Sequence, residues 1–351
     1  MKRILYVFLS WMLFSIQGWA QNSVNNHYFT IDNIDNEYFS IPWVKNTQHP
    51  KVVERINQTI QMNTVGCLYK VKGEEKFFEE MMPLDGTQGT VGLDYVILIN
   101  TPEILSIAFT KETNAAYPDT HYSYLNFNAA TGHQIELDEL FTPNGLLELH
   151  ILAARQYNRA IREFYQTAFD RGLLQKGDYE SRGKVLLDLM ECNTSNRISF
   201  FGVQSGDIVV RKDRCFAHVA QIVDIDWETT VRVDHFNKED LTALGEALLV
   251  DKKPIATTHY SKHPNRMEIH GRIDGKYAFT MNLYFDVDSA WGSYWYNHNG
   301  GFINIEVKQL SPDTIEVSED GAKFLFKIQD DGTLTGHWTK SNGKRYTIAF
   351  D

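Results

Sequence analysis

Cysteine is scarce in this sequence, positive charge is in deficit, and no complete catalytic motif is present. The 351 residues include three cysteines, 34 basic side chains and 45 acidic side chains, which gives a net charge of −11. Proteins that bind nucleic acids or anionic membranes normally present a basic face, so this balance argues against both classes. The Cys-x-x-Cys, Gly-x-Ser-x-Gly and P-loop spacings are absent, and we expect neither a metal ion nor an organic cofactor.

The chain does carry enough apolar residues to fold. Hydrophobic side chains make up 43% of the sequence and aromatic side chains 13%, against 23% charged residues. This composition excludes general disorder, and the length suits roughly two domains of about 150 residues each. After residue 20 no run is apolar enough for a transmembrane helix, so we expect no membrane span in the mature protein.

Residues 1–20 have the pattern of a secretory signal peptide. Lys2 and Arg3 form a positive start, Ile4–Ile16 is an apolar run, and Gly18-Trp19-Ala20 places small residues before Gln21. An uncleaved anchor is the alternative, but the run is short for a bilayer core of about 30 Å. We therefore expect a periplasmic or secreted protein. Loss of two cations, with no anion among residues 1–20, would move the net charge from −11 to −13.

Export permits disulfide bonds, which persist outside the cytosol. Cys192 and Cys215 flank two strand-like runs, Arg197–Phe201 and Asp207–Val210, and a hairpin there would bring the two cysteines together. A Cys192–Cys215 bridge is one interpretation. Three buried free thiols are the other, because reduced cysteine packs as a small hydrophobe. Cys67 is expected to be a strand residue rather than a nucleophile.

Residues 25–250 combine strand-like and helical patterns in separate blocks. A short helix is predicted from Pro50, and a long amphipathic helix is predicted over Leu146–Leu173. Asn237 is placed to cap a final helix that reaches Leu248. Strand-like runs are predicted at Tyr28–Ile31, Tyr38–Ile41, Val65–Val71, Val91–Ile99, Ile104–Phe109 and Tyr122–Phe127. Segregated blocks favour an α+β domain, with an antiparallel sheet and the long helix, over a doubly wound sheet.

The pattern of apolar and polar residues changes after residue 250. Residues 251–264 resemble a polar linker with two prolines, and no helical pattern appears in residues 265–351. Short alternating runs are separated there by the turn pairs Asp274-Gly275, Gly300-Gly301, Asp320-Gly321, Asp331-Gly332 and Asn342-Gly343. Short strands joined by tight hairpins predict an all-β up-and-down barrel or sandwich of about eight strands.

Asn114–Phe141 contains a series of recognisable short motifs. A loop of small residues and proline precedes a tyrosine-rich strand, an Asn-Phe-x-x-x-Thr-Gly turn from Asn126 and a Leu-x-x-Leu-Phe helix entry from Leu137. The series resembles the extracytoplasmic domain shared by the lysozyme-sensing anti-sigma factor RsiV and the peptidoglycan deacetylase PdaC. Asp213–Trp227 resembles variants of that domain in exported proteins of Bacteroidetes-like bacteria. The resemblance covers roughly Ile41–Val250, and residues 265–351 resemble small β domains of such proteins more loosely.

The departures from this family bear on function. RsiV-type proteins carry a cytoplasmic segment and a membrane helix, which are missing here, so the resemblance does not imply an anti-sigma role. PdaC-type deacetylases use an acidic pair followed by His-x-x-x-His ligands. His259 and His263 have that spacing, but Pro264 follows at once and Asp330-Asp331 comes after the histidines. We expect no metal site there. The resemblance implies recognition of cell-wall glycan or of a lysozyme.

Tyr117, Asp119 and His121 crowd a predicted loop at the start of a strand. A histidine beside a carboxylate is a candidate general base, and Tyr117 is a candidate ligand contact. The alternative is ordinary turn structure, with Pro118-Asp119 starting the turn.

Two acidic clusters raise the question of cation binding. Carboxylates at alternate positions of a strand face one side and are able to bind a cation, although a solvated face is the more common outcome. The residues concerned are Asp224, Asp226 and Glu228, and Asp286, Asp288 and Ser289.

The densest aromatic cluster lies between Trp291 and Tyr296. Trp291 and Trp295 share one strand face, and Tyr294 and Tyr296 take the other. Exposed rings of this kind stack on sugars or bury apolar ligands, whereas inward rings fill a small barrel. We keep Trp291, Trp295 and Trp338 as candidate ligand contacts.

These patterns together favour an exported, two-domain, non-enzymatic binding protein of the bacterial envelope. The expected partner is cell-wall glycan or an extracellular protein, with a cationic protein favoured by the acidic chain. The alternatives are a hydrolase or deacetylase-related enzyme that uses the Tyr117–His121 loop, and a purely structural envelope component.

Overall fold

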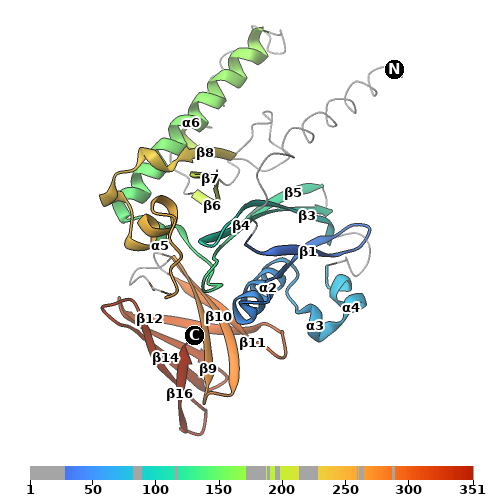
Figure 1. Ribbon diagram of the computed structural model, residues 1–351, viewed down its shortest axis with the longest axis vertical. Helices are drawn as coiled ribbons and strands as arrows, with labels where there is room; N and C mark the ends of the chain where they lie inside the picture. Colours follow the sequence, from blue (N-terminus) through green and yellow to red (C-terminus); the bar gives the residue numbers. More distant parts are fainter. Residues whose placement is uncertain are drawn as a thin grey trace.

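The structure is a computed structural model that describes residues 28–81, 89–114, 118–170, 187, 190–193, 198–212, 228–258, 260, 265–286 and 289–350. An α+β part is followed by a closed antiparallel β-barrel (Figure 1). The predicted fold class is therefore confirmed. The expected signal peptide, His259 and His263 lie outside the described residues.

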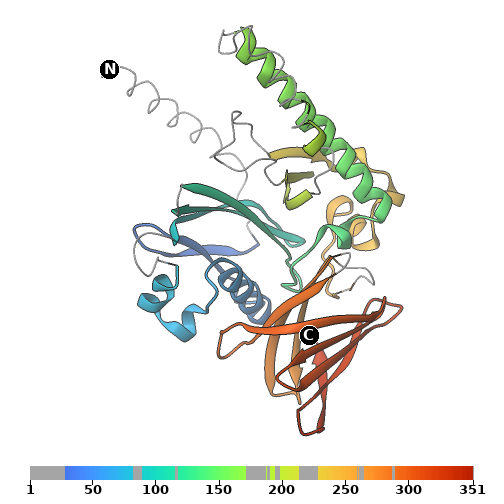
Figure 2. The ribbon, with the colours of Figure 1, turned by 180° about the vertical axis from the view of Figure 1, so that it is seen from behind.

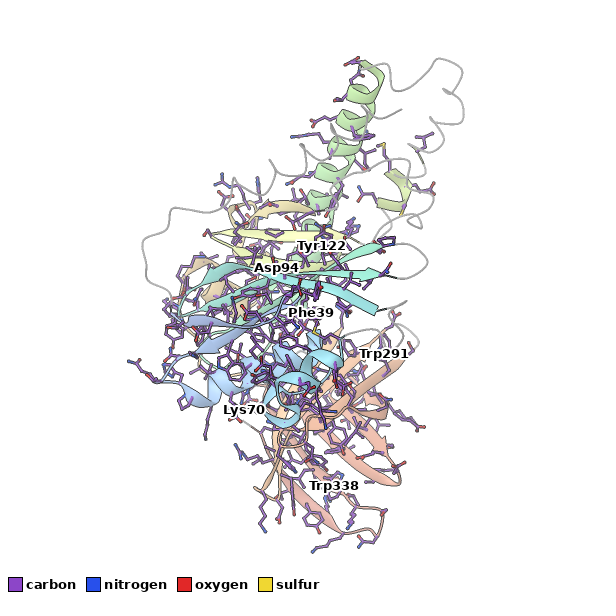
Figure 3. All side chains as sticks on the ribbon, turned by 90° about the vertical axis from the view of Figure 1, so that its right-hand side faces the viewer. Phe39, Lys70, Asp94, Tyr122, Trp291 and Trp338 are labelled. Carbon is purple, nitrogen blue, oxygen red and sulfur yellow. The ribbon has the colours of Figure 1, made fainter. Side chains whose placement is uncertain are left out.

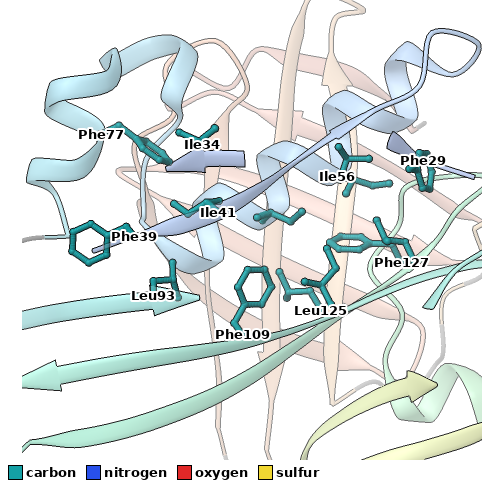
Figure 4. Packing of buried hydrophobic residues seen from close by; sticks show 14 of the residues in the cluster. Phe29, Ile34, Phe39, Ile41, Ile56, Phe77, Leu93, Phe109, Leu125 and Phe127 are labelled. Carbon is teal, nitrogen blue, oxygen red and sulfur yellow. The ribbon is translucent and has the colours of Figure 1, made fainter. Parts of the chain in front are cut away.

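The first core forms between two small antiparallel sheets and a helix. The bounds are β1 Thr30–Asp35 and β2 Ser40–Lys45 in one sheet, β3 Gly89–Asn100, β4 Ile104–Asn114 and β5 Asp119–Asn128 in the other, and α2 Pro50–Thr64. Pro50 begins α2, and Ile56 and Ile60 of its apolar face are fully buried. Both side chains belong to one buried cluster with Phe109 and Phe127 of the larger sheet, and Figure 4 shows Ile56 beside Phe127. Helix α2 lies between this sheet and the barrel (Figures 1 and 2).

The strand predicted over Val65–Val71 is wrong. Gly66 has a φ of 86°, which turns the chain, and the short helices α3 (Tyr69–Lys72) and α4 (Glu74–Glu79) follow. Gln61 Oε1 accepts a hydrogen bond of 2.8 Å from the Tyr69 amide and so holds this turn against α2. Cys67 is buried in the turn as a free thiol.

A second core forms around the long helix. Its elements are α5 Leu137–Leu140, α6 Pro143–Asp170, β6 Ile198–Gln204, β7 Asp207–Lys212, β8 Glu228–Arg232, η3 Val233–His235, η4 Lys238–Asp240, α8 Ala243–Gly245 and η5 Glu246–Val250. Tyr157 of α6 donates a hydrogen bond of 2.8 Å to the Val210 carbonyl. The single helix predicted after Asn237 is instead three short pieces. Asn237 caps only η4, and Thr242 caps the next piece by accepting from the Gly245 amide.

The barrel closes on itself through eight neighbouring strands. These are β9 Arg266–Ile273, β10 Tyr277–Phe285, β11 Ala290–Tyr296, β12 Ile303–Ser311, β13 Thr314–Glu319, β14 Ala322–Ile328, β15 Leu334–Thr339 and β16 Arg345–Phe350, with β16 paired to β9. The β9–β10 hairpin turns at Asp274 (φ 54°) and Gly275 (φ 66°), the backbone that Asp-Gly favours. Large apolar side chains, including Phe279, Phe324 and Phe326, fill the interior.

Candidate functional site

Asp119 and His121 lie on strand β5 rather than in a loop. Their side chains project from the same face, with 3.9 Å between His121 Nε2 and Asp119 Oδ2. The His121 side chain is 59% exposed. A hollow of about 510 Å³ borders Asp119 and Thr120, but His121 is not part of its wall. Tyr117 lies outside the described residues.

The other acidic candidates take part in local structure where they are described. Tyr124 donates a hydrogen bond to Glu228, and Arg211 Nη2 lies 3.6 Å from that carboxylate. The Asp286 amide donates to the Ser289 carbonyl at 2.8 Å, which closes the β10–β11 turn. Asp224, Asp226 and Asp288 lie outside the described residues. Among the residues the structure describes, no group of three or more His, Cys, Asp or Glu side chains is able to hold a metal ion.

Cys192 is disulfide-bonded. Cys215, the partner expected from the sequence, lies outside the described residues, so the pairing stays a prediction.

The three candidate tryptophans have different environments. Trp295 is fully buried, and it packs on the outside of the barrel against Met62 of α2 and Leu68. Trp338 points inward, with its ring centroid 5.6 Å from that of Tyr346. Of these three side chains only Trp291 is exposed, with 52% of its surface accessible. Figure 3 places Trp291 at the end of the barrel near the first domain and Trp338 farther from it.

Trp291 belongs to a row of side chains that crosses the outer face of three strands. The sheet register pairs Arg266 of β9 with Tyr284 of β10, and Tyr284 with Trp291 of β11. The rings of Tyr284 and Trp291 are stacked, with centroids 5.7 Å apart and planes 11° from parallel. The Arg266 guanidinium lies 5.5 Å from the centroid of the Tyr284 ring. We call Arg266, Tyr284 and Trp291 the aromatic row.

Polar groups border the aromatic row. Glu306 of β12 continues the row beyond Trp291, and Ser293 and Asn304 lie opposite each other in the neighbouring row. Glu306 and Asn304 are exposed, and Ser293 is half-buried. A ring face bordered by hydroxyl, amide and carboxylate groups is suited to a sugar, because it offers both apolar contact and hydrogen bonds.

A buried group of charged side chains lies beside this row, where the two domains meet. His270 Nε2 lies 2.7 Å from Glu268 Oε1, and His270 Nδ1 lies 3.1 Å from Thr280 Oγ1. This order of carboxylate, imidazole and hydroxyl occurs in hydrolases. Thr280 is 0% exposed and Glu268 2%, however, so a substrate does not reach the hydroxyl. The arrangement is structural.

The first domain supplies the other half of this charged group. His133 Nε2 lies 2.9 Å from Glu139 Oε1, and both side chains are buried. Glu136 Oε1 accepts a hydrogen bond of 2.8 Å from Arg266 Nη1, which joins the two domains directly. We call Glu268, His270, His133, Glu139, Glu136 and Arg266 the charged junction.

Burial shifts the titration of the charged junction. It lowers the pKa of His270 to about 4, because the low-dielectric surroundings disfavour the imidazolium form. Burial opposes ionisation of Glu268, but the hydrogen bond from His270 and the positive charge of Arg266 favour the carboxylate and hold the pKa of Glu268 below its usual range. Burial raises the pKa of the neighbouring Asp138 to about 7, with a further contribution from the charge of Glu139.

No sequence motif predicted the charged junction. The available signal was the alternation Arg266, Glu268, His270 along one face of β9. Such alternation normally indicates a solvated strand face, and only the packing of α2 and of residues 133–139 buries it.

Comparison with known proteins assigns neither a family nor a function to the chain. No protein-family model matches the chain, and no curated protein matches it significantly. A crystal structure of a member of the DUF3298 family from Bacteroides fragilis is a distant structural neighbour, with a TM-score of 0.40 and 10% sequence identity. The match covers 66% of this chain and 100% of that chain. The chain is similar to this neighbour only at that level, which assigns neither an activity nor a ligand.

Proposed function

We propose that the protein is a non-enzymatic binding protein of the bacterial envelope that recognises cell-wall glycan through the aromatic row. The observation that carries the proposal is the half-exposed Trp291 ring, stacked on Tyr284 and bordered by Ser293, Asn304 and Glu306. The stacking partner fixes the orientation of the Trp291 ring before a ligand arrives, which reduces the entropy lost on binding.

Sequence features support the setting of this proposal. The signal-peptide pattern of residues 1–20 supports export to the envelope or beyond. The resemblance of Asn114–Phe141 to RsiV-like and PdaC-like domains supports a ligand that is either cell-wall glycan or a lysozyme. The exposed, ring-bearing surface favours glycan over protein, because it is small and bordered by hydrogen-bonding groups.

An enzyme at Asp119 and His121 is less well supported. His121 is largely exposed, and 3.9 Å separates its Nε2 from the Asp119 carboxylate, beyond hydrogen-bond distance. A general base acts through a hydrogen bond to the proton that it removes, usually in a site that excludes water. The His121 side chain is 59% exposed and the Asp119 side chain 28%, so water reaches both groups.

A sedimentation experiment tests the proposal. The chain from Gln21 onward is incubated with purified insoluble peptidoglycan, and in a parallel arm it is passed over immobilised lysozyme. We expect the protein to sediment with peptidoglycan and soluble glycan fragments to release it. Retention by lysozyme without sedimentation on peptidoglycan would replace the glycan with a cationic protein partner. Release of acetate or of reducing ends would instead indicate an enzyme.

A further inference from the structure

A separate cavity lies where the first domain meets the barrel. It has a volume of about 480 Å³ and is bounded by strand β2, helices α2 and α3, and Asn297 of the turn after β11. Ligand cavities in proteins typically measure roughly 300–1,000 Å³ and often lie between domains. Trp43, Val53 and Leu68 supply apolar wall. Lys70, labelled in Figure 3, also borders the cavity, with its Nζ 5.7 Å from the centroid of the Trp43 ring.

Carboxamide side chains are unusually frequent in this wall. They are Asn46, Asn57, Gln58, Gln61 and Asn297. Three of them hold the backbone in place. Asn57 bonds both the amide and the carbonyl of Val44, Gln61 accepts from the Tyr69 amide, and Asn46 donates to the Tyr28 carbonyl. The two that remain, Gln58 and Asn297, are the ones with capacity to recognise a ligand.

Gln58 has a buried acceptor that lacks a protein partner. The residue is 8% exposed, and its Nε2 donates to Glu54 Oε1 at 3.4 Å. Because a carboxylate only accepts hydrogen bonds, Glu54 fixes which end of the amide faces it. Gln58 Oε1 is buried and makes no hydrogen bond to any residue that the structure describes. A buried acceptor in this state destabilises the protein until a donor reaches it.

Asn297 offers the complementary group from the barrel side. One end of its amide lies 3.2 Å from Thr280 Oγ1, which leaves the other end to bond a ligand. Thr280 in turn contacts His270 and, through it, Glu268. The cavity wall is therefore linked to the charged junction through Thr280.

We propose that this cavity binds one sugar ring, whose hydroxyl or amide groups bond the Asn297 amide and Gln58 Oε1, the Gln58 side chain turning to bring its buried oxygen to the cavity surface. Trp43 provides the apolar surface that the ring face of a sugar requires. The ammonium group of Lys70 would accommodate a carboxylate on the same sugar. The inference rests on the proposed glycan-binding function, but it uses none of the residues of the aromatic row. The cavity is a second sugar subsite on the same molecule.

Titration of the whole chain from Gln21 onward with N-acetylglucosamine, followed by NMR of side-chain amide signals, tests this subsite. Glycerol serves as a polyol control without a ring. We expect the Gln58 and Asn297 signals to shift with N-acetylglucosamine and not with glycerol. Gln58→Leu, which keeps the side-chain volume and removes the unpaired acceptor, should weaken binding at least tenfold while the melting temperature stays equal or rises.

Gln309→Leu is the matched control, because Gln309 is an exposed amide on barrel strand β12, away from the cavity wall. It should leave the affinity unchanged. Absence of any shift up to the solubility limit of the sugar would overturn the subsite, as would unchanged binding by Gln58→Leu. Sedimentation on peptidoglycan tests the proposed function independently of this titration. A protein that sediments but fails this titration retains the proposed function and loses only the cavity subsite.

Discussion

Thr59 of helix α2 donates a hydrogen bond of 3.3 Å to Glu268 Oε2 of barrel strand β9, across 209 residues of sequence. Thr59 is 0% exposed and Glu268 2%. The other carboxylate oxygen of Glu268 pairs with His270 at 2.7 Å and accepts from the Gln134 amide at 3.4 Å. A single carboxylate therefore joins both domains. Specific polar contacts hold the barrel against the first domain, in addition to the chain connection between them.

The first prediction concerns Glu268. Glu268→Ala should lower the free energy of unfolding by about 2–4 kcal/mol, because it leaves the buried His270 and Thr59 without their hydrogen-bond acceptor. Chemical denaturation at pH 7 measures this. Glu316→Ala, which removes the carboxylate of a surface pair with Lys323, is the control and should change stability by less than about 1 kcal/mol. Equal effects would mean that the charged junction does not stabilise the domain contact.

The second prediction concerns the loss of stability at acidic pH. The pKa of His270 is about 4 in the folded protein and 6.5 is its ordinary value, so the unfolded chain binds the extra proton first. Stability from this group is complete above pH 6.5 and is lost as the pH falls toward 4. His270→Gln keeps hydrogen-bonding capacity and removes the titration. As the pH falls from 6.5 to 4, the free energy of unfolding of the variant, relative to that of the wild type, should therefore rise by up to about 1.4 kcal/mol per pH unit. Parallel stability curves would contradict the assignment.

The third prediction has the opposite sign and concerns Asp138. Its Oδ2 accepts from the Asn265 amide at 3.0 Å, and its pKa is raised from 3.8 to about 7. The folded protein keeps this proton longer than the unfolded chain, so the contribution of Asp138 to stability falls as the pH rises from about 4 to 7. Asp138→Asn should lack this loss. Its stability relative to the wild type, measured by denaturation at pH 5 and pH 8, should be clearly greater at pH 8. A difference that stays constant with pH would show that Asp138 is ionised normally.

The fourth prediction separates the two outer-face tryptophans of β11. Trp295→Ala should lower the free energy of unfolding by about 3–5 kcal/mol, because the ring is fully buried against Met62 and Leu68. Trp291→Ala should lower it by only about 1 kcal/mol, the value of one stacked aromatic pair. Thermal and chemical denaturation of both variants distinguish the two cases. A larger loss from Trp291→Ala would place Trp291 in the core.

The barrel could be predicted because its turns have strong local chemistry. Asp274-Gly275 adopts the left-handed backbone that the pair favours, and this holds whatever surrounds the hairpin. The strand predicted over Val65–Val71 was wrong because a side-chain contact from helix α2 decides the local structure there. Its apolar alternation suits a strand, but the side chain of Gln61 captures the Tyr69 amide and fixes a turn. The alternation of apolar residues in the sequence does not reveal that hydrogen bond.

The candidate site was predictable only in part. Strand periodicity correctly placed Trp291 and Trp295 on one face, since side chains alternate along a strand. Which of them is covered depends on where α2 packs, 230 residues or so earlier in the chain, and no periodicity encodes that. The Gln58 acceptor was equally hidden, because an amide in a helix gives no sign of whether its partner is present.

The most direct test of the central proposal measures the affinity of a soluble peptidoglycan fragment for the wild type, for Trp291→Ala and for Tyr277→Ala. Tyr277 is a matched control, since it is 54% exposed on the same barrel and lies outside the aromatic row. Loss of a stacked ring weakens binding by about 1–3 kcal/mol, or about 5- to 150-fold. We predict that Trp291→Ala shows such a loss while remaining folded and that Tyr277→Ala binds like the wild type. Equal affinities of the wild type and folded Trp291→Ala would contradict the proposal.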